Sequence, residues 1–292
     1  MTLGNTNCVS RSPTLLKKWP AFKSAEMATD FPILYDKVGY VARLTINRPH
    51  VLNAMDTAAH EAFSSHLDDC EADNDVRVVV VTGVGHRAFS VGRDLKAMAA
   101  ENEMSAAEKM ELSHRWRNIR RLTDRHDFTK PVIARVNGLA LGGGFEIALA
   151  CDIIIATEEA CFGLPEAKRG LIPFAGGVHR LPRQIPLKIA VGHLITGRTM
   201  TSERAYSLGL INAVVPSNRL DEEVNAWVAD VLACAPLAVR AIKQCVAQGF
   251  GRTLEAAMTA EYPLEILRRA SSDSVEGPRA FAEKRAPVWT GQ

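Results

Sequence analysis

The chain alternates between short apolar segments rich in β-branched residues and longer stretches with helical periodicity. Helical patterns cover about residues 54–73 and 106–126, and each lies between two segments that have the composition of a strand. This alternation predicts an α/β fold in which helices connect parallel strands. The expected strands are 40–48 (YVARLTINR), 76–83 (VRVVVVTG), 131–138 (PVIARVNG) and 151–157 (CDIIIAT).

The last third of the chain changes to helical periodicity with almost no strand signal. Four prolines, Pro216, Pro236, Pro263 and Pro278, punctuate this run. A helical region of this length on an α/β core suggests oligomer packing or a lid over an active site. The expected helices are 219–234, 236–248, 252–269 and 275–285.

These patterns divide the chain into an N-terminal extension at 1–28, an α/β core at 29–217 and a helical C-terminal module at 218–292. The extension lacks a clean apolar signal core and a cleavage site, so we expect it to be disordered or to lie upstream of a natural start at Met27. No apolar run reaches the about 18 residues that a membrane-spanning helix needs. We therefore expect a cytoplasmic protein with no membrane partner.

Three consecutive glycines lie in the apolar run GLALGGGFEIALACDII at 138–154. Each glycine inside a helix costs about 1 kcal/mol relative to alanine, so their position needs a reason. A helix N-terminus offers free N–H groups and the positive end of the helix dipole, and glycine permits close approach. The N–H of Gly143 could therefore donate to a carbonyl oxygen that gains charge during a reaction. The alternative is a tight turn in which the glycines only relieve crowding.

A second glycine-bearing loop lies at 86–98 (HRAFSVGRDLKAM), after the apolar strand expected at 76–83. Gly92 stands in this loop just before an expected helix. Two such loops could direct two N–H donors at one carbonyl oxygen, and an ordinary connection between strand and helix is the alternative. Neither loop has the GxGxxG spacing of a dinucleotide site, and no Walker lysine follows.

Two glutamates lie in apolar surroundings near these glycines. Glu146 follows Gly143 by three residues, so its side chain returns to the same face near the helix start. Glu166 follows Pro165, a residue suited to the first turn of a helix, where a carboxylate meets the positive end of the dipole. Two acids beside a polarised carbonyl are the groups that proton transfer next to that carbonyl requires. Stabilisation of a first turn is the alternative role for Glu166.

Composition and charge narrow the choice of partners. Hydrophobic residues make up 47% of the chain, enough for a substantial core, and the net charge of +2 implies no polyelectrolyte partner. The basic cluster HRWRNIRR at 114–121 is flanked by acidic residues, which favours a solvated helix face over a nucleic-acid site. Six scattered cysteines without a CxxC motif predict free thiols and no metal site.

Together these segments resemble the crotonase superfamily, which includes enoyl-CoA hydratases and isomerases. The resemblance covers about residues 32–292, and the order and spacing of its parts make it specific. The parts are LTINRPHVLNAMD (44–56), AFSVGRDLKAM (88–98), KPVIARVNGLALGGGFEIALACDIIIA (130–156), FGLPEAKRGLIPFAGGVHRLPR (162–183) and AFAEKRAPVW (280–289).

The resemblance implies a spiral of β-β-α turns and a helical C-terminal module that packs homotrimers, usually paired into hexamers. It implies that the backbone N–H groups of Arg93 and Gly143 form an oxyanion hole and that Glu146 and Glu166 are the acid/base pair of a hydratase. Many superfamily members lack one of these acids. The expected reaction is therefore the reversible addition of water to a 2-enoyl-CoA, giving a 3-hydroxyacyl-CoA.

The implied substrate is an acyl-CoA thioester, with no metal or redox cofactor. The expected contacts to the substrate and to CoA are Val91, Gly92, Asp94, Leu95, Gly142, Phe174 and Lys284. For Lys284 a solvated helix face is the alternative. At position 93, where many hydratases have a small residue, the arginine could pair with Asp94, with a CoA phosphate or with an acyl carboxylate.

Several alternatives stay open within and beyond the superfamily. The PEAKRGLIP segment and the tail VEGPRAFAEKRAPVWTGQ look closest to carnitinyl-CoA dehydratases, which add water across the same kind of conjugated thioester. An enoyl-CoA isomerase could work with one acid alone. A catalytically silent protein that binds RNA or another protein is disfavoured, because both acids are present and the net charge is close to neutral.

Overall fold

The structure, a computed structural model, describes residues 31–292, so the extension expected at 1–28 lies outside the described residues. A six-stranded sheet with the order β1-β2-β3-β5-β7-β10 forms the centre of the fold. Its first two strands pair antiparallel, and the later neighbours pair parallel. The strands are β1 (Ile33–Val38), β2 (Val41–Ile46), β3 (Val78–Gly83), β5 (Val132–Val136), β7 (Ile153–Thr157) and β10 (Ala213–Val215).

Helices cover both faces of this sheet, which explains the composition of its strands. Every residue of β2, β3 and β5 is buried, as expected for parallel strands that are covered on both sides. Within β3, Val79 joins the main core with α1 (Thr57–Ala72), whereas Val80 packs in a second cluster with α8 (Leu220–Leu232). Because alternate side chains of a strand point to opposite faces, β3 connects the two clusters.

A second sheet of four short strands has the order β4-β6-β8-β9. Each of β4, β6 and β8 follows a strand of the large sheet, and helical segments follow each pair. The chain therefore winds in repeated turns of strand, strand and helix, which confirms the predicted α/β spiral. The short strands are β4 (Ala88–Ser90), β6 (Leu139–Leu141), β8 (Cys161–Gly163) and β9 (Met200–Thr201).

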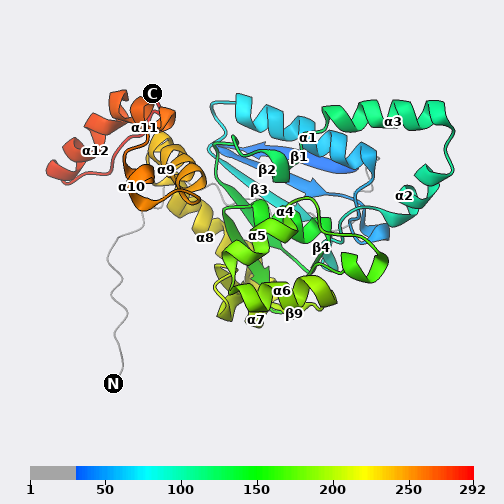
Figure 1. The fold of residues 1–292 in the computed structure, drawn as a ribbon. Helices are drawn as coiled ribbons and strands as arrows, with labels where there is room; N and C mark the ends of the chain where they lie inside the picture. Colours follow the sequence, from blue (N-terminus) through cyan, green and yellow to red (C-terminus); the bar gives the residue numbers. More distant parts are fainter. Residues whose placement is uncertain (1–30) are drawn as a thin grey trace, which may run out of the picture.

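Figure 1 shows α1 and α3 at the top of the core and α6 and α7 at the bottom, with the strands of the large sheet between them. The glycine-led helix α4 connects β6 with β7, so it is a crossover between parallel strands. The helices of this region are α2 (Leu95–Asn102), α3 (Ala106–Asn118), α4 (Gly143–Ala150), α5 (Gly177–Gln184), α6 (Leu187–Thr196) and α7 (Ser202–Ser207).

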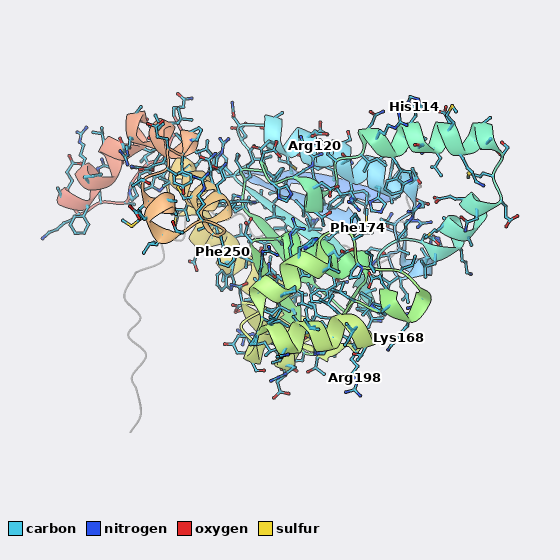
Figure 2. All side chains as sticks on the ribbon, in the orientation of Figure 1. His114, Arg120, Lys168, Phe174, Arg198 and Phe250 are labelled. Atoms are coloured by element: carbon cyan, nitrogen blue, oxygen red, sulfur yellow. The ribbon has the colours of Figure 1, made fainter. Side chains whose placement is uncertain are left out.

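The C-terminal module begins with α8 against the sheet and continues in helices that stand to one side of the core (Figure 1). It exposes large apolar side chains, among them Phe250, which is 69% exposed (Figure 2). Within residues 31–292 no single helix is long and apolar enough to cross a membrane, and one pair that passes together is bent by 100°. The helices that follow α8 are α9 (Pro236–Gly249), α10 (Leu254–Met258), α11 (Pro263–Ala270) and α12 (Asp273–Ala282).

Some predicted elements differ from the structure. The helix expected at 106–126 ends at Asn118, and a separate short turn follows at Leu122–Asp124. The helix expected at 252–269 is two helices, because Pro263 lacks the N–H that a continuing helix needs and instead begins α11. The three-residue strands of the second sheet were too short to carry a periodic signal.

Candidate active site

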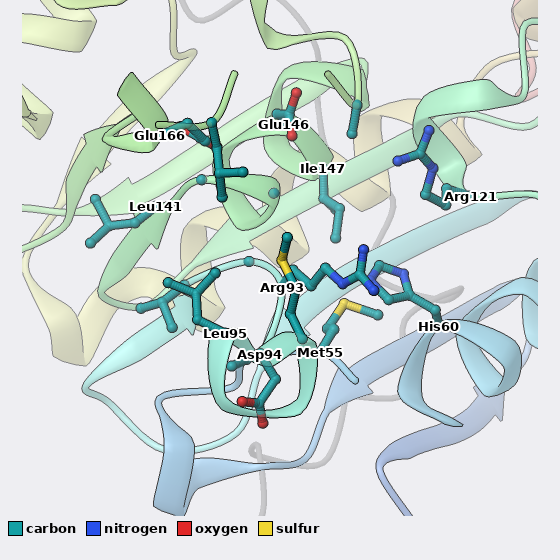
Figure 3. A pocket seen from close by; sticks show the side chains of 18 of the residues that line it. Met55, His60, Arg93, Asp94, Leu95, Arg121, Leu141, Glu146, Ile147 and Glu166 are labelled. Atoms are coloured by element: carbon teal, nitrogen blue, oxygen red, sulfur yellow. The ribbon is translucent and has the colours of Figure 1, made fainter. Parts of the chain in front are cut away.

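A cavity of about 940 Å³ lies between the two sheets and the helices that follow them. Figure 3 shows side chains from several separate segments around it. Ten of the eleven predicted site residues line this cavity. They are Val91, Gly92, Arg93, Asp94, Leu95, Gly142, Gly143, Glu146, Glu166 and Phe174.

Lys284 is the predicted residue that does not line this cavity. It follows α12 in the C-terminal module, where it is exposed and has a left-handed backbone with φ 53°. The alternative considered from the sequence was a solvated helix face; Lys284 is exposed in a single protomer, but it lies just after α12 and not on its face.

The two glycine-bearing loops meet at the cavity wall. Gly92 has φ +86°, and a Cβ built on it would lie 2.5 Å from the amide nitrogen of Gly143, too close for any side chain. A Cβ built on Gly143 would in turn lie 3.7 Å from the amide nitrogen of Arg93. The amides of Arg93 and Gly143 are therefore neighbours, although fifty positions separate them in the chain (143 − 93 = 50).

Both amides are available as donors to a molecule in the cavity. Gly143 is the first residue of α4, where the N–H has no partner within the helix. Next to it, Met55 accepts from Asp94 N at 2.9 Å and donates to Gly92 O at 2.8 Å. In this parallel bridge the intervening residue, Arg93, directs its own amide away from Met55. Two N–H groups from two loops therefore converge on one wall.

The third glycine of the triplet has a packing role that the sequence did not reveal. A Cβ on Gly144 would lie 2.1 Å from the carbonyl oxygen of Ser90, so only glycine lets α4 approach the end of β4. This close approach is what brings the start of α4 beside the Gly92 loop. The tight-turn interpretation is therefore correct for Gly144, whereas Gly143 presents its N–H to the cavity.

Glu146 is buried, with 3% of its surface exposed, on the first turn of α4. Its Oε1 accepts a hydrogen bond from the amide of Gly177 at 2.8 Å. The pKa of Glu146 is raised to about 7, mainly by burial; the hydrogen bond from Gly177 acts against this shift, and the nearby Glu166 carboxylate adds to it. Near neutral pH this carboxyl group can therefore both accept and donate a proton.

Glu166 opens the short helical turn Glu166–Arg169 after Pro165. Its Oε1 lies beside the start of α4, 3.1 Å from where a Cβ of Gly142 would be. Its Oε2 is buried and has no hydrogen-bond partner in the described part of the chain. Burial raises the pKa of this carboxyl group as well. Both glutamates therefore stand by the two amides with their acidity reduced.

The raised pKa of Glu146 predicts a pH-dependent effect of Glu146→Gln on stability. In the unfolded chain the group titrates near 4.5, and in the folded protein near 7, so between these values the folded state binds more protons. The contribution of this carboxyl group to the free energy of unfolding therefore falls as pH rises through the window, and it stays constant above it. Glutamine carries no charge and does not titrate. The free energy of unfolding of the variant minus that of wild type should therefore be larger at pH 8 than at pH 5, by up to about 3 kcal/mol.

Urea unfolding of both proteins at the two pH values measures this difference. Glutamine retains a carbonyl oxygen that can accept from Gly177, so the substitution changes the charge with little change in shape. An equal stability difference at pH 5 and pH 8 would show that Glu146 is not held in a proton-binding environment.

The side chain of Arg93 turns toward one end of the cavity. Its guanidinium pairs with Glu101 of α2 and lies 4.8 Å from the centroid of the Trp116 ring. Asp94, the partner considered from the sequence, instead pairs with Arg48 at 3.1 Å and caps α2 by accepting from Lys96 N. Of the three partners considered for Arg93, Asp94 is therefore not the one that the structure shows, because Asp94 is occupied at the helix start.

Three residues at this end of the cavity were not predicted as site residues: His60 of α1, Trp116 of α3 and Arg121. The rings of His60 and Trp116 lie 5.1 Å apart. The basic cluster at 114–121 is a solvated face only in part, since Trp116 and Arg121 line the cavity while Arg115 pairs with Glu61. A tryptophan within a highly charged helix was the available signal.

The chemistry of the site is that of hydrogen bonds and carboxyl groups. Within residues 31–292 there is no group of three or more histidine, cysteine, aspartate or glutamate side chains that could hold a metal ion. The cysteines of that range are free. Two amides can stabilise negative charge on an oxygen, and two carboxyl groups beside them can move protons to and from neighbouring atoms.

Known proteins are similar to this chain in sequence and in fold. A family profile described as enoyl-CoA hydratase/isomerase matches residues 36–292. Carnitinyl-CoA dehydratase from Salmonella typhi is 42% identical over 266 residues, which cover 87% of this chain and 96% of that protein.

Solved structures extend the similarity to three dimensions. An enoyl-CoA hydratase from Bacillus anthracis has a TM-score of 0.81 and 33% identity, over 89% of this chain and 100% of that chain. An enoyl-CoA hydratase from Mycobacterium tuberculosis H37Rv has a TM-score of 0.80 and 35% identity, over 90% of this chain and 100% of that chain. The similarity includes the core and the C-terminal helices.

Proposed function

Because this chain belongs to the enoyl-CoA hydratase/isomerase family of the crotonase superfamily and is a hydro-lyase, we propose that it is an enoyl-CoA hydratase. It would add water reversibly to a 2-enoyl-CoA and give a 3-hydroxyacyl-CoA. One observation carries this proposal: the cavity holds the buried Glu146 and the half-buried Glu166 beside two convergent backbone N–H groups.

The two amides polarise the substrate. The thioester carbonyl oxygen accepts hydrogen bonds from the N–H groups of Arg93 and Gly143, and these bonds strengthen as negative charge develops on that oxygen. Electron density is drawn from the conjugated double bond, so the β-carbon becomes electrophilic. Each such donor contributes about 3–4 kcal/mol in enzymes of this kind of chemistry.

The two glutamates handle the water. Burial raises the pKa of both carboxyl groups, which favours a pair that shares one proton near neutral pH. The deprotonated glutamate accepts a proton from water as the water oxygen bonds to the β-carbon. The protonated glutamate gives its proton to the α-carbon. The first glutamate then carries the proton of the pair, and exchange within the pair or with solvent restores the starting state. No step requires a metal or a redox cofactor.

The predicted activity is measured with crotonyl-CoA, by the loss of absorbance of its conjugated thioester. We expect rapid loss with 3-hydroxybutyryl-CoA as the product, identified by mass spectrometry. A product of unchanged mass with a shifted double bond would instead establish an isomerase. The absence of any reaction with crotonyl-CoA and with longer and branched 2-enoyl-CoAs would contradict the proposal.

Dehydration of carnitinyl-CoA is the second candidate, favoured by the identity of 42% to the Salmonella protein of that name. The bonds made and broken are the same as in crotonyl-CoA hydration, and only the acyl group differs. Crotonobetainyl-CoA is therefore the second substrate to assay. A silent binding protein is disfavoured because both glutamates are present in the cavity.

The C-terminal module supports a proposed homotrimer or dimer of trimers. Its outer helices expose large apolar side chains that no part of residues 31–292 covers. Burial of such side chains between protomers is the usual reason for their exposure in a single chain. Lys284 can contact the nucleotide of CoA only if this module lies over the cavity of another protomer. Among the exposed side chains are Ile242, Val246, Phe250, Leu254 and Met258.

A further inference from the structure

We propose that the acyl end of this cavity selects CoA thioesters whose acyl group ends in a carboxylate, and that Arg93, Arg121 and His60 recognise that carboxylate. The acyl end is the part of the cavity wall formed by these three residues and Trp116. The inference rests on the proposed function, because it concerns the acyl group of the same thioester.

The acyl end gathers polar groups from separate segments. Arg93 comes from the Gly92 loop, His60 from α1 and Trp116 from α3, and all of them line the cavity with Arg121. The Arg93 guanidinium covers one face of the Trp116 ring at 4.8 Å, and the His60 ring lies 5.1 Å from that ring. Figure 3 shows the guanidinium of Arg93 beside the ring of His60. A purely hydrocarbon acyl group would offer no acceptor to the donors of this end that its ion pairs leave unused.

The acyl end holds two guanidinium groups, each with an acid beside it. The pKa of His60 is lowered to about 4, mainly by burial and in addition by the charges of Arg121 and then Arg93. The acids near this ring, Asp56 and Asp124, act in the opposite direction and have smaller effects. The histidine is therefore neutral at pH 7 and can donate one hydrogen bond.

The existing ion pairs leave donors for a ligand. Arg121 uses Nε and one terminal nitrogen on Asp124, at 2.7 and 2.9 Å, and Arg93 pairs with Glu101, which does not line the cavity. A guanidinium has five N–H donors in a planar fork, so one paired edge leaves others available. The indole nitrogen of Trp116 is buried and has no partner among the described residues.

The same arrangement disfavours a quaternary ammonium group. An aromatic face is the usual protein surface that binds such a cation. The Trp116 face is already covered by the guanidinium of Arg93. A trimethylammonium group at this end would therefore meet two guanidinium groups and a Trp116 face that one of them already covers. Carnitinyl-CoA ends in a trimethylammonium group. The inference therefore predicts that this chain prefers an acyl group of the opposite charge to that in the name of the Salmonella relative.

The experiment measures binding of saturated acyl-CoAs to the full protein by calorimetry, because saturated thioesters bind without being hydrated. Glutaryl-CoA carries the carboxylate, and 5-methylhexanoyl-CoA is its uncharged counterpart of the same shape. 4-(Trimethylammonio)butanoyl-CoA and 5,5-dimethylhexanoyl-CoA form the matched cationic and uncharged pair. We expect glutaryl-CoA to bind about tenfold or more tightly than its counterpart, since hydrogen bonds to a charged group have that effect. We expect the cationic ligand to bind less tightly than its counterpart.

Variants assign the effect to the acyl end. Arg121→Gln should reduce the preference for glutaryl-CoA over 5-methylhexanoyl-CoA about tenfold. Arg120→Gln is the matched control, because Arg120 is adjacent in sequence, pairs with Asp127 and does not line the cavity. The control should keep the wild-type preference. Equal loss in both variants would overturn the assignment to Arg121.

The outcomes distinguish this inference from the proposed function. Equal affinity for glutaryl-CoA and its uncharged counterpart, or tighter binding of the cationic ligand, would overturn the inference even if crotonyl-CoA is hydrated. A clear preference for glutaryl-CoA supports it even if no 2-enoyl-CoA is hydrated, in which case the proposed function fails alone. The corresponding unsaturated thioester, glutaconyl-CoA, then tests whether selection in binding extends to turnover.

Discussion

Glu146→Gln is expected to lower kcat for the hydration of crotonyl-CoA between about 10²- and 10⁴-fold, the usual contribution of one acid or base in the reacting geometry. The carboxyl group lies on the first turn of α4, next to the amides proposed to hold the carbonyl oxygen. Its pKa of about 7, raised by burial, suits a group that both takes and gives a proton at neutral pH. Glutamine keeps the shape of the side chain but has no carboxyl group that can take or give a proton.

The controls separate chemistry from folding. The same substitution is expected to stabilise the protein at pH 8, so lost activity would coincide with retained or increased stability. Glu159→Gln is a matched control, since Glu159 is exposed, bonds Ser217 at 2.7 Å and does not line the cavity. That variant should keep wild-type kcat. Near wild-type hydration by Glu146→Gln would mean that the reaction does not pass through this carboxyl group.

Gly143→Pro is expected to lower kcat about 10²- to 10³-fold by removing one donor of the oxyanion hole. Proline has no N–H, but it is well tolerated as the first residue of a helix, which is the position of Gly143 in α4. The helix can therefore form while the donor is lost. The measurement is steady-state kinetics with crotonyl-CoA, with circular dichroism to establish that the helical content is kept.

Gly143→Ala is the matched variant for this prediction. Alanine keeps the N–H and adds a Cβ, whose nearest neighbour would be the Cα of Gly92 at 3.4 Å, an ordinary contact. The alanine variant alone measures the added methyl group, and the difference between the two variants measures the loss of the N–H together with the ring carbon that proline puts in its place. If both variants lost the same activity, the effect would come from crowding and the oxyanion role of Gly143 would be incorrect.

The strands of the large sheet were predictable because their composition reflects burial on both faces. The segment VVVVT in β3 is apolar whichever way a side chain points, and the segments of β5 and β7 have the same character. β1 was missed, because ILYDKV is half-buried and carries charged residues at the edge of the sheet. The short strands β4, β6 and β8 are fixed by pairing with one another, which no local pattern reveals.

The candidate site was predictable where local geometry determines what a group can do. A helix start leaves its N–H groups free wherever it lies, and the side chain three residues later returns to the same face. Gly143 and Glu146 follow from this rule alone. The acyl end was missed because His60, Trp116 and Arg121 belong to separate segments, and each resembles an ordinary surface or core residue in isolation.

The sequence by itself determined the elements, the family resemblance and the chemical groups available: two acids, two glycine-bearing loops and a helix that begins between strands. Only the tertiary structure decided which groups meet. The approach of α4 to Ser90, possible because Gly144 has no side chain, brings the amides of Arg93 and Gly143 together. The physical reason is that covalent geometry fixes the relative positions of only a few neighbouring residues. Contacts between distant segments form when the spiral buries its apolar faces and its successive turns pack against one another.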